Sequence, residues 1–380
     1  MPAHIAKDAE LQARIDAARQ RSLAWLATMQ APGQPLGVSR ISAAHDPKSW
    51  PGMLLPGSYN AVMNLALLGG LADWSDDRRQ ALADWLLSHR QADGVFRIPG
   101  MHDRDVFKKP DRRETWTYID FHVSNYTLGA IDLLQADARP QLDFLHPWLE
   151  PVALKAWLAE RDLRDPWLEG NNIVNLGSFL LLLARQAERP LRAQVERCMT
   201  VLFDWHDRLQ EPATGFWGVG QSSNPTAALH AMAGSMHNFH LWYATARPLP
   251  YQDKAVDWSL TQPPQVVSAC IDADLVDLLT HAHALIDHRR GEIEQWLRRL
   301  LPALLTFQHA DGGFADERVG IRRQDGWVRG YEEPQGLSNT FATWFRWIAI
   351  AMIAECLWPG RWPWQFRRMI GIGYRRVAAA

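Results

Sequence analysis

One phrase recurs along the chain and constrains its fold more than any other feature: a helical stretch containing tryptophan, then glutamine, then a glycine turn, then an aromatic residue. Its two fullest copies span Gln91 to Phe96 and Gln308 to Phe314. Related copies end at Gln30, Gln210 and Gln262, and a weaker one without glutamine surrounds Trp157. Glycine just beyond the last helical turn favours a left-handed cap, glutamine can bridge the unpaired carbonyls of the helix end, and the aromatic residue can fold back as an apolar plug. The phrase therefore predicts repeated helical units.

Apolar stretches with polar beginnings lie between these phrases. The polar beginnings are near residues 58–60, 122–126, 170–172, 237–240, 272–274 and 338–340, and the apolar runs follow at 61–68, 128–134, 174–184, 241–246, 275–279 and 342–354. Helices that are apolar nearly all round are buried, whereas the amphipathic stretches 78–89 and 292–305 should lie outside. Six inner and six outer helices in alternation predict an all-α, single-domain (α/α)6 toroid over residues 1–380. Because its inner helices are parallel, their polar beginnings should gather at one mouth.

The composition excludes several classes of protein. The 380 residues carry 40 Lys+Arg against 42 Asp+Glu, a net charge of -2, which argues against a dedicated nucleic-acid binder. With 47% hydrophobic and 22% charged residues, the chain can bury a sizeable core. The 19 tryptophans suggest an aromatic core or a cavity walled with rings. Three cysteines without a C-x-x-C pair argue against a disulfide framework or a structural zinc site.

The sequence also bears on location. The first residues lack the apolar run of a secretion signal, and the longest apolar runs, 176–184 and 347–354, are too short to span a bilayer. We therefore expect a cytoplasmic protein. The aromatic and basic segment 358–376 is expected to pack on the first outer helix, and peripheral contact with a membrane surface is the alternative.

The two fullest phrases resemble the Q-x-x-D-G-x-F/W repeats of the terpenoid cyclase and protein prenyltransferase α/α-toroid superfamily. Asp272-Ala-Asp274 is similar to the D-x-D-D acid motif of class II terpene cyclases, with Leu275 at the third acidic position. The resemblance implies that Asp274 protonates an alkene or epoxide, with Asp272 as its partner. It implies acid-initiated cyclisation of a polyprenyl substrate, and we expect no cofactor.

This chemistry needs a neutral acid in a dry pocket, whereas a solvated aspartate titrates near ~3.9. Two carboxyls close together at a buried helix start could share a proton. The alternative interpretation is that Asp272 caps the helix and Asp274 adds a first-turn charge. Carbocations would need aromatic faces around them, although any one ring could equally be core packing. The rings expected near the mouth are Phe239, Trp242, Tyr243, Trp327, Phe341 and Trp344.

A second hypothesis comes from a different class of enzyme. Asn171 and Asn172 open one inner stretch while His237 and Tyr243 lie on another, a set that resembles the Asn/His/Tyr sites of toroid polysaccharide lyases. The two aspartates could instead be the acid and base of a glycoside hydrolase. The asparagine pair could also be a helix cap. A non-catalytic binding toroid is the third hypothesis.

These hypotheses share one set of candidate residues. The candidate catalytic residues are Asp274, Asp272, His237 and Tyr243. The candidate substrate-binding residues are Tyr59, Asn60, His122, Asn125, Asn171, Asn172, Asn238, His240, Trp242, Trp327, Tyr331, Asn339, Phe341 and Trp344. The expected partner is a small isoprenoid or glycan, and no nucleic acid.

Metal binding and loops complete the sequence-based expectations. His237 and His240 can share a helix face, but no third ligand stands at metal spacing, so we expect no metal. His281 is expected at the far end of its helix, in a structural role. The long charged loops 99–116 and 316–334 could be lids over the mouth, with basic residues that could meet a diphosphate or a uronate.

Overall fold

The computed structural model describes residues 3–99, 116–138, 141–219, 227–316, 323–324, 331–334 and 336–375. Within them lie twelve α-helices: α1 (Ala3–Thr28), α2 (Leu54–Leu67), α3 (Asp76–Leu87), α4 (Trp116–Leu134), α5 (Pro151–Ala159), α6 (Pro166–Gln186), α7 (Arg189–Leu209), α8 (Ala227–Thr245), α9 (Gln252–Thr261), α10 (Ala269–Leu285), α11 (Arg290–Leu305) and α12 (Thr340–Leu357). The expectation of an all-α fold is confirmed.

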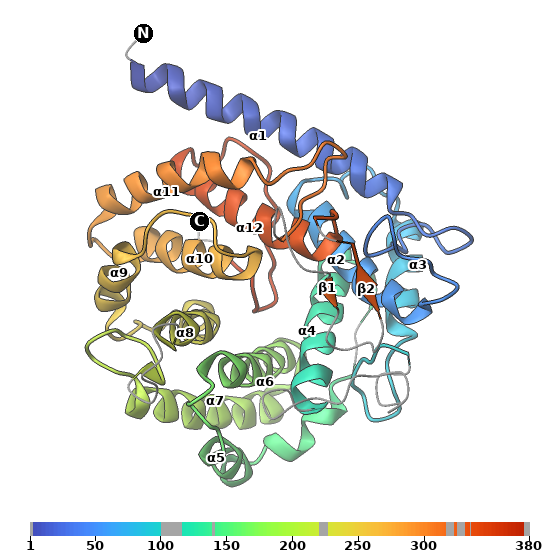
Figure 1. The fold of residues 1–380 in the computed structure, drawn as a ribbon. Helices are drawn as coiled ribbons and strands as arrows, with labels where there is room; N and C mark the ends of the chain where they lie inside the picture. Colours follow the sequence, from blue (N-terminus) through green and yellow to red (C-terminus); the bar gives the residue numbers. More distant parts are fainter. Residues whose placement is uncertain are drawn as a thin grey trace.

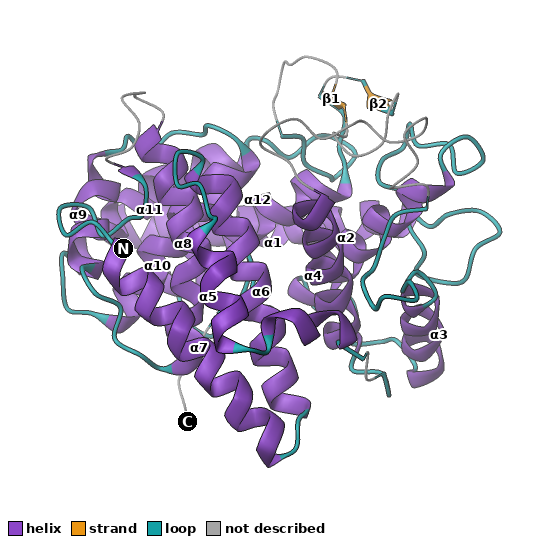
Figure 2. Ribbon diagram, turned by 90° about the horizontal axis from the view of Figure 1, so that it is seen from below, coloured by secondary structure: helices purple, strands orange, loops and turns teal. Residues whose placement is uncertain are grey.

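Four short elements accompany the α-helices. Two are 3-10 helices, η1 (Pro51–Met53) and η2 (Asp143–Trp148). The others are two-residue strands, β1 (Arg323–Gln324) and β2 (Glu332–Glu333), which pair antiparallel. The strands lie at the end of the molecule where α12 begins, and so cover no face of the helices (Figure 2).

The even-numbered helices contact one another in a closed cycle. Going round it, α2 packs on α4, α4 on α6, α6 on α8, α8 on α10, α10 on α12, and α12 returns to α2. Figure 1 looks along these helices, with α3, α5, α7, α9 and α11 outside them and α1 along the outer edge beside α11. Helices distant in sequence are therefore neighbours, and the hydrogen bond from Asn64 Nδ2 to the carbonyl of Thr340 (2.9 Å) helps to join α2 to α12.

Burial follows the apolar pattern of the sequence. Most residues of α2, α10 and α12 are buried, whereas α3 buries Leu82, Ala83 and Leu86 along one side. The stretches predicted to be amphipathic and external correspond to α3 and α11. Helix α12 is long and apolar enough to cross a membrane, but 83% of it is buried inside the fold, as in the core helix of a soluble protein.

The glycine turns of the repeated phrase form as predicted, but Gln308 acts differently from the expectation. Gly94 and Gly312 have φ of +94° and +99°, a backbone conformation that glycine adopts without strain. The side chain of Gln308 donates to the carbonyl of Gly312 (3.0 Å) and to that of Ala18 in α1 (2.7 Å). Gln308 thus closes the turn and ties it to the neighbouring unit, whereas Gln91 donates to the carbonyl of His89 at the end of its own helix (3.0 Å), as expected.

One further hydrogen bond recurs with the phrase. The backbone N–H of the aromatic residue, or of its counterpart in the first unit, donates to a hydroxyl of the following inner helix. The four bonds, each 2.9 Å long, are Ser39 to Ser58, Phe96 to Ser124, Trp217 to Ser235 and Phe314 to Thr343. Because Phe96 and Phe314 are fully buried, each aromatic plug is anchored by both its ring and its backbone.

The helices begin earlier than the polar clusters suggest. Ser268 caps α10 and Asn339 caps α12, each accepting from a backbone N–H of its first turn. The largest error concerns α8, which begins at Ala227, ten residues before His237. The prediction that the cluster 237–240 opens this helix is wrong, because the small residues before it continue the helix without a break. His237 and His240 lie midway along α8.

The segment after α12 closes the end of the molecule opposite the strands (Figure 2). The indole N–H groups of Trp358 and Trp362 donate to Asp8 and Asp16 of α1, which confirms the predicted packing on the first outer helix. The carbonyl of Ile370 accepts from Asn125 of α4 and Ser178 of α6. Asn125 and Ser178 lie near the middle of α4 and α6, so the segment reaches into the interior between the inner helices.

Candidate functional site

Two histidine–aspartate pairs link α8 to α10. His237 Nε2 lies 3.7 Å from Asp274 Oδ1, and one turn further along both helices His240 Nε2 lies 2.8 Å from Asp277 Oδ1. The i,i+3 spacing on each helix puts the two pairs on facing surfaces. All four side chains are buried, and both aspartates are inaccessible to solvent.

Asp274 is a carboxyl group in an unusual environment. Neither of its oxygens has a hydrogen-bond partner in the part of the chain that the structure describes. Burial, reinforced by the charges of Asp277 and Asp272, raises the pKa of Asp274 well above its ordinary value. The surroundings of Asp274 therefore favour its protonated form, which is the form a general acid requires.

His237 remains uncharged beside this acid. Burial is the main cause, and His240 adds to it, so that the pKa of His237 falls to about 3. A neutral imidazole does not compete with Asp274 for a proton. The environment of the pair therefore favours the uncharged forms of both side chains.

Aromatic and imidazole side chains from α2 and α4 face this pair. His122 stacks on Tyr126 with ring centroids 4.5 Å apart, and Tyr59 lies 5.3 Å from Tyr126. His122 interacts electrostatically with His237, and Tyr126 with Asp274, so α4 contributes to the same interior. The pKa of His122 is lowered to about 3, chiefly by burial.

Asp272 does not share a proton with Asp274. It forms an ion pair with Arg346 of α12, in which both side chains are almost completely buried, and its second oxygen accepts from the backbone N–H of Val267 at 2.9 Å. Arg346 also donates to the carbonyl of Asp316 (2.6 Å). Asp272 thus holds the start of α10 against α12. This structural role is close to the alternative interpretation of the sequence, in which Asp272 is a carboxylate that stabilises the start of the helix.

The second pair belongs to a larger cluster. His281 Nδ1 lies 2.9 Å from Asp277 Oδ1, so that one carboxylate oxygen receives two imidazoles. Although burial opposes ionisation, these imidazoles hold the pKa of Asp277 well below its ordinary value. His240, Asp277 and His281 each offer one ligand atom, and the three atoms lie within 4.8 Å of one another, which makes this the candidate metal-ligand set of the described residues.

The candidate asparagines mostly hold backbone and side chains of the protein itself. Asn171 donates to the carbonyl of Trp167 and Asn172 to Glu169, both within α6. Asn238 donates to the carbonyls of Gly170 and Gly234, and Asn125 holds Arg367 and Ile370. Asn60 and Asn172 each keep a buried carbonyl oxygen without a partner among the described residues.

The candidate rings are dispersed. Trp242 packs on Phe203 and His206 of α7, in the wall between two helices. Tyr243 stacks on His281 and accepts a hydrogen bond from Gln252 at its hydroxyl.

The rings at the start of α12 are separate again. Phe341 pairs with Phe345, and the fully buried Trp344 packs against Gly373 of the C-terminal segment. None of these contacts joins Trp242, Tyr243, Phe341 or Trp344 to Asp274.

The loop candidates are partly described. Tyr331 donates to Glu333, which accepts from Asn339, so these residues brace the start of α12. Trp327 lies outside the described residues, as do most of the loops 99–116 and 316–334.

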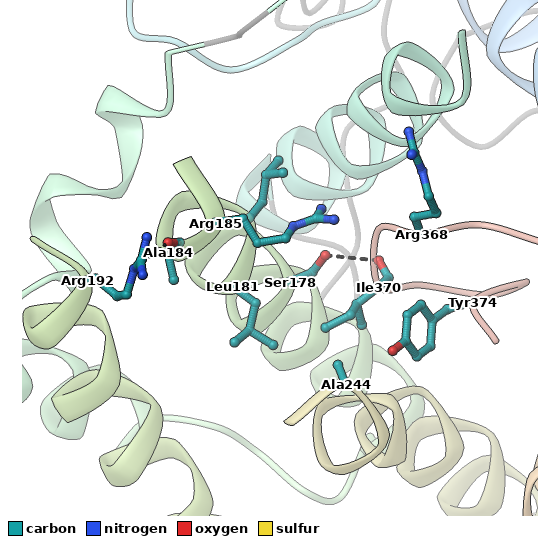
Figure 3. Close-up of a pocket in the computed structure, with 10 residues that line it drawn as sticks. Ser178, Leu181, Ala184, Arg185, Arg192, Ala244, Arg368, Ile370 and Tyr374 are labelled. Carbon is teal, nitrogen blue, oxygen red and sulfur yellow. Dashed lines mark hydrogen bonds between the residues drawn. The ribbon is translucent and has the colours of Figure 1, made fainter. Parts of the chain in front are cut away.

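A cavity of about 510 Å³ lies at the opposite end from Asp274, between the last turns of α6 and α8 and the C-terminal segment (Figure 3). Arg185, Arg192 and Arg368 line it without any acidic residue. Tyr374 also lines the cavity, and its ring lies 5.7 Å from that of His240. The cavity therefore approaches the His240–Asp277 pair from the side of the C-terminal segment.

Sequence reasoning missed Asp277, Tyr126 and Arg346, and it underrated His281. The signal was present for two of them, because Asp274, Asp277 and His281 follow an i, i+3, i+7 spacing that marks one helix face. The pairing of Arg346 with Asp272 could not be read from the sequence, since 74 positions separate them.

Comparisons with known proteins assign no family to the chain. No protein-family model matches the chain, and no curated protein matches it.

Proposed function

We propose that the chain is a single-domain (α/α)6 toroid of cytoplasmic location, related to the terpenoid cyclase and prenyltransferase superfamily. The closed cycle of contacts among α2, α4, α6, α8, α10 and α12 supports the toroid, and so does the recurring bond from each aromatic plug to the next inner helix. The buried α12 and the near-zero net charge are consistent with a soluble protein.

The function that the site supports best is acid-initiated cyclisation of a polyprenyl substrate. The observation that carries this proposal is the state of Asp274: a fully buried carboxyl without a hydrogen-bond partner among the described residues, whose pKa is raised well above its ordinary value. A carboxyl kept neutral in a dry interior is able to protonate an alkene or epoxide.

The proposed first step is transfer of the Asp274 proton to a terminal alkene carbon or to an epoxide oxygen. The π electron pair of the alkene takes the proton; in an epoxide a lone pair of the oxygen takes it, and the C–O bonding pair moves onto that oxygen as the ring opens. A carbocation forms as Asp274 becomes a carboxylate. Ring closure moves the cation along the chain, loss of a proton from the last cation ends the sequence, and Asp274 is reprotonated from solvent. The ring of Tyr126, which interacts with Asp274, would stabilise the cations together with the neighbouring Tyr59, and would share this role with its contact to Arg367, whose guanidinium carbon lies 5.6 Å from the ring centroid.

The glycan hypothesis ranks second because its key amides are already engaged. Asn171, Asn172 and Asn238 hydrogen bond within α6 or between α6 and α8. Asp272, the second carboxylate needed by a glycoside hydrolase, is paired with Arg346.

The test incubates the full chain with linear polyprenyl alcohols, diphosphates and squalene, and in parallel with neutral and acidic oligosaccharides. We expect cyclic isoprenoid products by gas chromatography–mass spectrometry, and a loss of about 100-fold or more in Asp274→Asn. Asp287→Asn, which alters a carboxylate that is 93% exposed, is the matched control and should keep full activity.

Full activity in Asp274→Asn would remove the acid from the mechanism. Cleavage of an oligosaccharide would favour the second hypothesis. Absence of turnover of either class would favour a binding toroid.

A further inference from the structure

His240, Asp277 and His281 form a compact set of two imidazoles and one carboxylate. Asp277 and His281 are an i,i+4 pair on α10, and His240 reaches them from α8. Ligand sets of this kind, drawn from facing helices of a helical protein, are a common way to build a metal site. The three side chains are 0%, 0% and 5% exposed, in the order His240, Asp277, His281.

Asp277 is incompletely paired for a fully buried carboxylate. It has no lysine or arginine within ion-pair distance among the described residues, and Arg375 acts on it only from farther away. Asp277 Oδ2 is buried without a hydrogen-bond partner in the described part of the chain. A buried acceptor without a donor is costly, and a cation beside this carboxylate would offset that cost.

The side chains are also held in place before any ligand arrives. His281 Nδ1 lies 3.0 Å from the carbonyl of Asp277, and its ring stacks on Tyr243 at 4.5 Å with an interplanar angle of 7°. His240 has Tyr374 beside it at 5.7 Å. These contacts orient both rings, and a metal ion would have to take His281 Nδ1, the nitrogen next to Asp277 Oδ1, from its backbone partner.

We propose that His240, Asp277 and His281 bind a divalent transition-metal ion, with zinc as the expected occupant. Imidazole nitrogen and carboxylate oxygen are ordinary zinc ligands, and a tetrahedral ion would take a water molecule as its fourth ligand. The sequence-based expectation of no metal rested on pairing His240 with His237, whereas the structure pairs His240 with Asp277 and His281. The site does not depend on the proposed cyclase activity.

Binding requires a small local change. Tetrahedral ligands at zinc distances stand about 3.3 Å apart. The present contacts of 2.8 and 2.9 Å are hydrogen-bond distances, so the ion must displace the protons between these groups and widen each contact by about half an ångström. Metal uptake is therefore expected to release protons and to weaken as the pH falls.

The test measures metal in the full chain, purified without a histidine tag from zinc-supplemented cells. We expect about one zinc per chain by inductively coupled plasma mass spectrometry, and at least a tenfold lower content in His240→Gln, Asp277→Asn and His281→Gln. The matched control is the double variant His288→Gln/Asp257→Asn, which removes a partly exposed His–Asp pair with the same 2.8 Å separation and should keep the metal.

A second measurement does not depend on the variants' folding. Cobalt(II) added to the chelator-stripped wild-type chain should give the visible absorption of a tetrahedral N/O site, saturating at one equivalent, and zinc should abolish it. A folded wild-type chain without metal and without cobalt absorption would overturn the proposal, as would full zinc content in the three variants. Because no substrate is used, these outcomes are independent of the cyclisation assay.

Discussion

Two aspartates one helical turn apart, Asp274 and Asp277, are driven in opposite directions by their surroundings. Both are fully buried, and burial by itself favours the protonated form of each. Asp277 receives two imidazoles, which lower its pKa, whereas Asp274 has no donor among the described residues and its pKa is raised. The local supply of hydrogen-bond donors therefore decides which of the two can act as an acid.

This difference predicts that Asp274 costs stability at neutral pH. Its folded-state pKa lies above the unfolded value, so its contribution is most favourable below about pH 4 and is lost as the pH rises toward the folded pKa. Asp274→Asn should therefore raise the free energy of unfolding at pH 7 relative to wild type, and should show no such gain at pH 4. Urea denaturation at both pH values measures this. A variant less stable than wild type at pH 7 would contradict the prediction.

At this scale the sequence predicted part of the site. The motif resemblance led to Asp274, and the polar clusters led to His122 and His237. The sequence could not show that Asp272 is paired with Arg346, or that the asparagines bind the protein's own backbone, because those partners come from other helices. Side-chain identity suggests a chemistry, but packing decides whether the group is available.

Among the elements, α6 and α8 approach each other most closely where glycines replace side chains. A Cβ added to Gly170 would lie 2.5 Å from the carbonyl oxygen of Gly234, and one added to Gly234 would overlap the carbonyl of Pro166. The same contact carries the bond from Asn238 to the carbonyl of Gly170, and Asn238 is the residue after His237. The spacing of these helices therefore helps to position the candidate site.

Gly234→Ala should accordingly destabilise the protein by about 2–3 kcal/mol, because backbone atoms cannot yield to the added methyl group. Gly291→Ala is the control, since no atom lies within 4 Å of the added Cβ in α11, and its effect should stay within about 0.5 kcal/mol of wild type or be slightly stabilising. Guanidinium denaturation gives both values. Equal effects of the two substitutions would show that the close approach does not matter.

The elements themselves were largely predictable. The repeated phrase located the ends of α3, α7, α9 and α11, because a glycine or extended turn after an amphipathic run is a local signal. The start of α8 was misplaced by ten residues, because the polar cluster 237–240 was taken as the helix start in place of the polar residues 221–226 that directly precede Ala227 in the sequence. The recurring bond to a hydroxyl of the next helix was also beyond sequence reasoning, as its partners lie about 20 to 30 positions apart.

Across the whole molecule, uncharged buried histidines should set the response to acid. The pKa values of His122 and His237 are lowered to about 3 and that of His206 to about 4, in each case chiefly by burial. The unfolded chain takes up these protons below about pH 6.5 while the folded chain does not. Stability is therefore present above pH 6.5 and is lost as the pH falls toward 4.

His206 allows this to be tested away from the candidate site, since it bonds to the Leu202 carbonyl and to Asn238. Between pH 7.5 and pH 5, His206→Gln should lose about 2 kcal/mol less stability than the wild-type chain. Chemical denaturation at the two pH values supplies the comparison. An identical loss in both proteins would mean that His206 is not kept neutral by the fold.

The joint between α2 and α12 has a consequence for how the chain assembles. The bonds from Asn238 to Gly170 and from Arg346 to Asp272, which join other successive inner helices, span 68 and 74 positions, whereas Asn64 and Thr340 are 276 positions apart. Closing so long a loop is entropically slow, so this joint is expected to form last. Until then the partly assembled ring of helices would leave the acids and imidazoles of its interior exposed to water. The shift in the pKa of Asp274 would therefore arise only once α2 and α12 have come together.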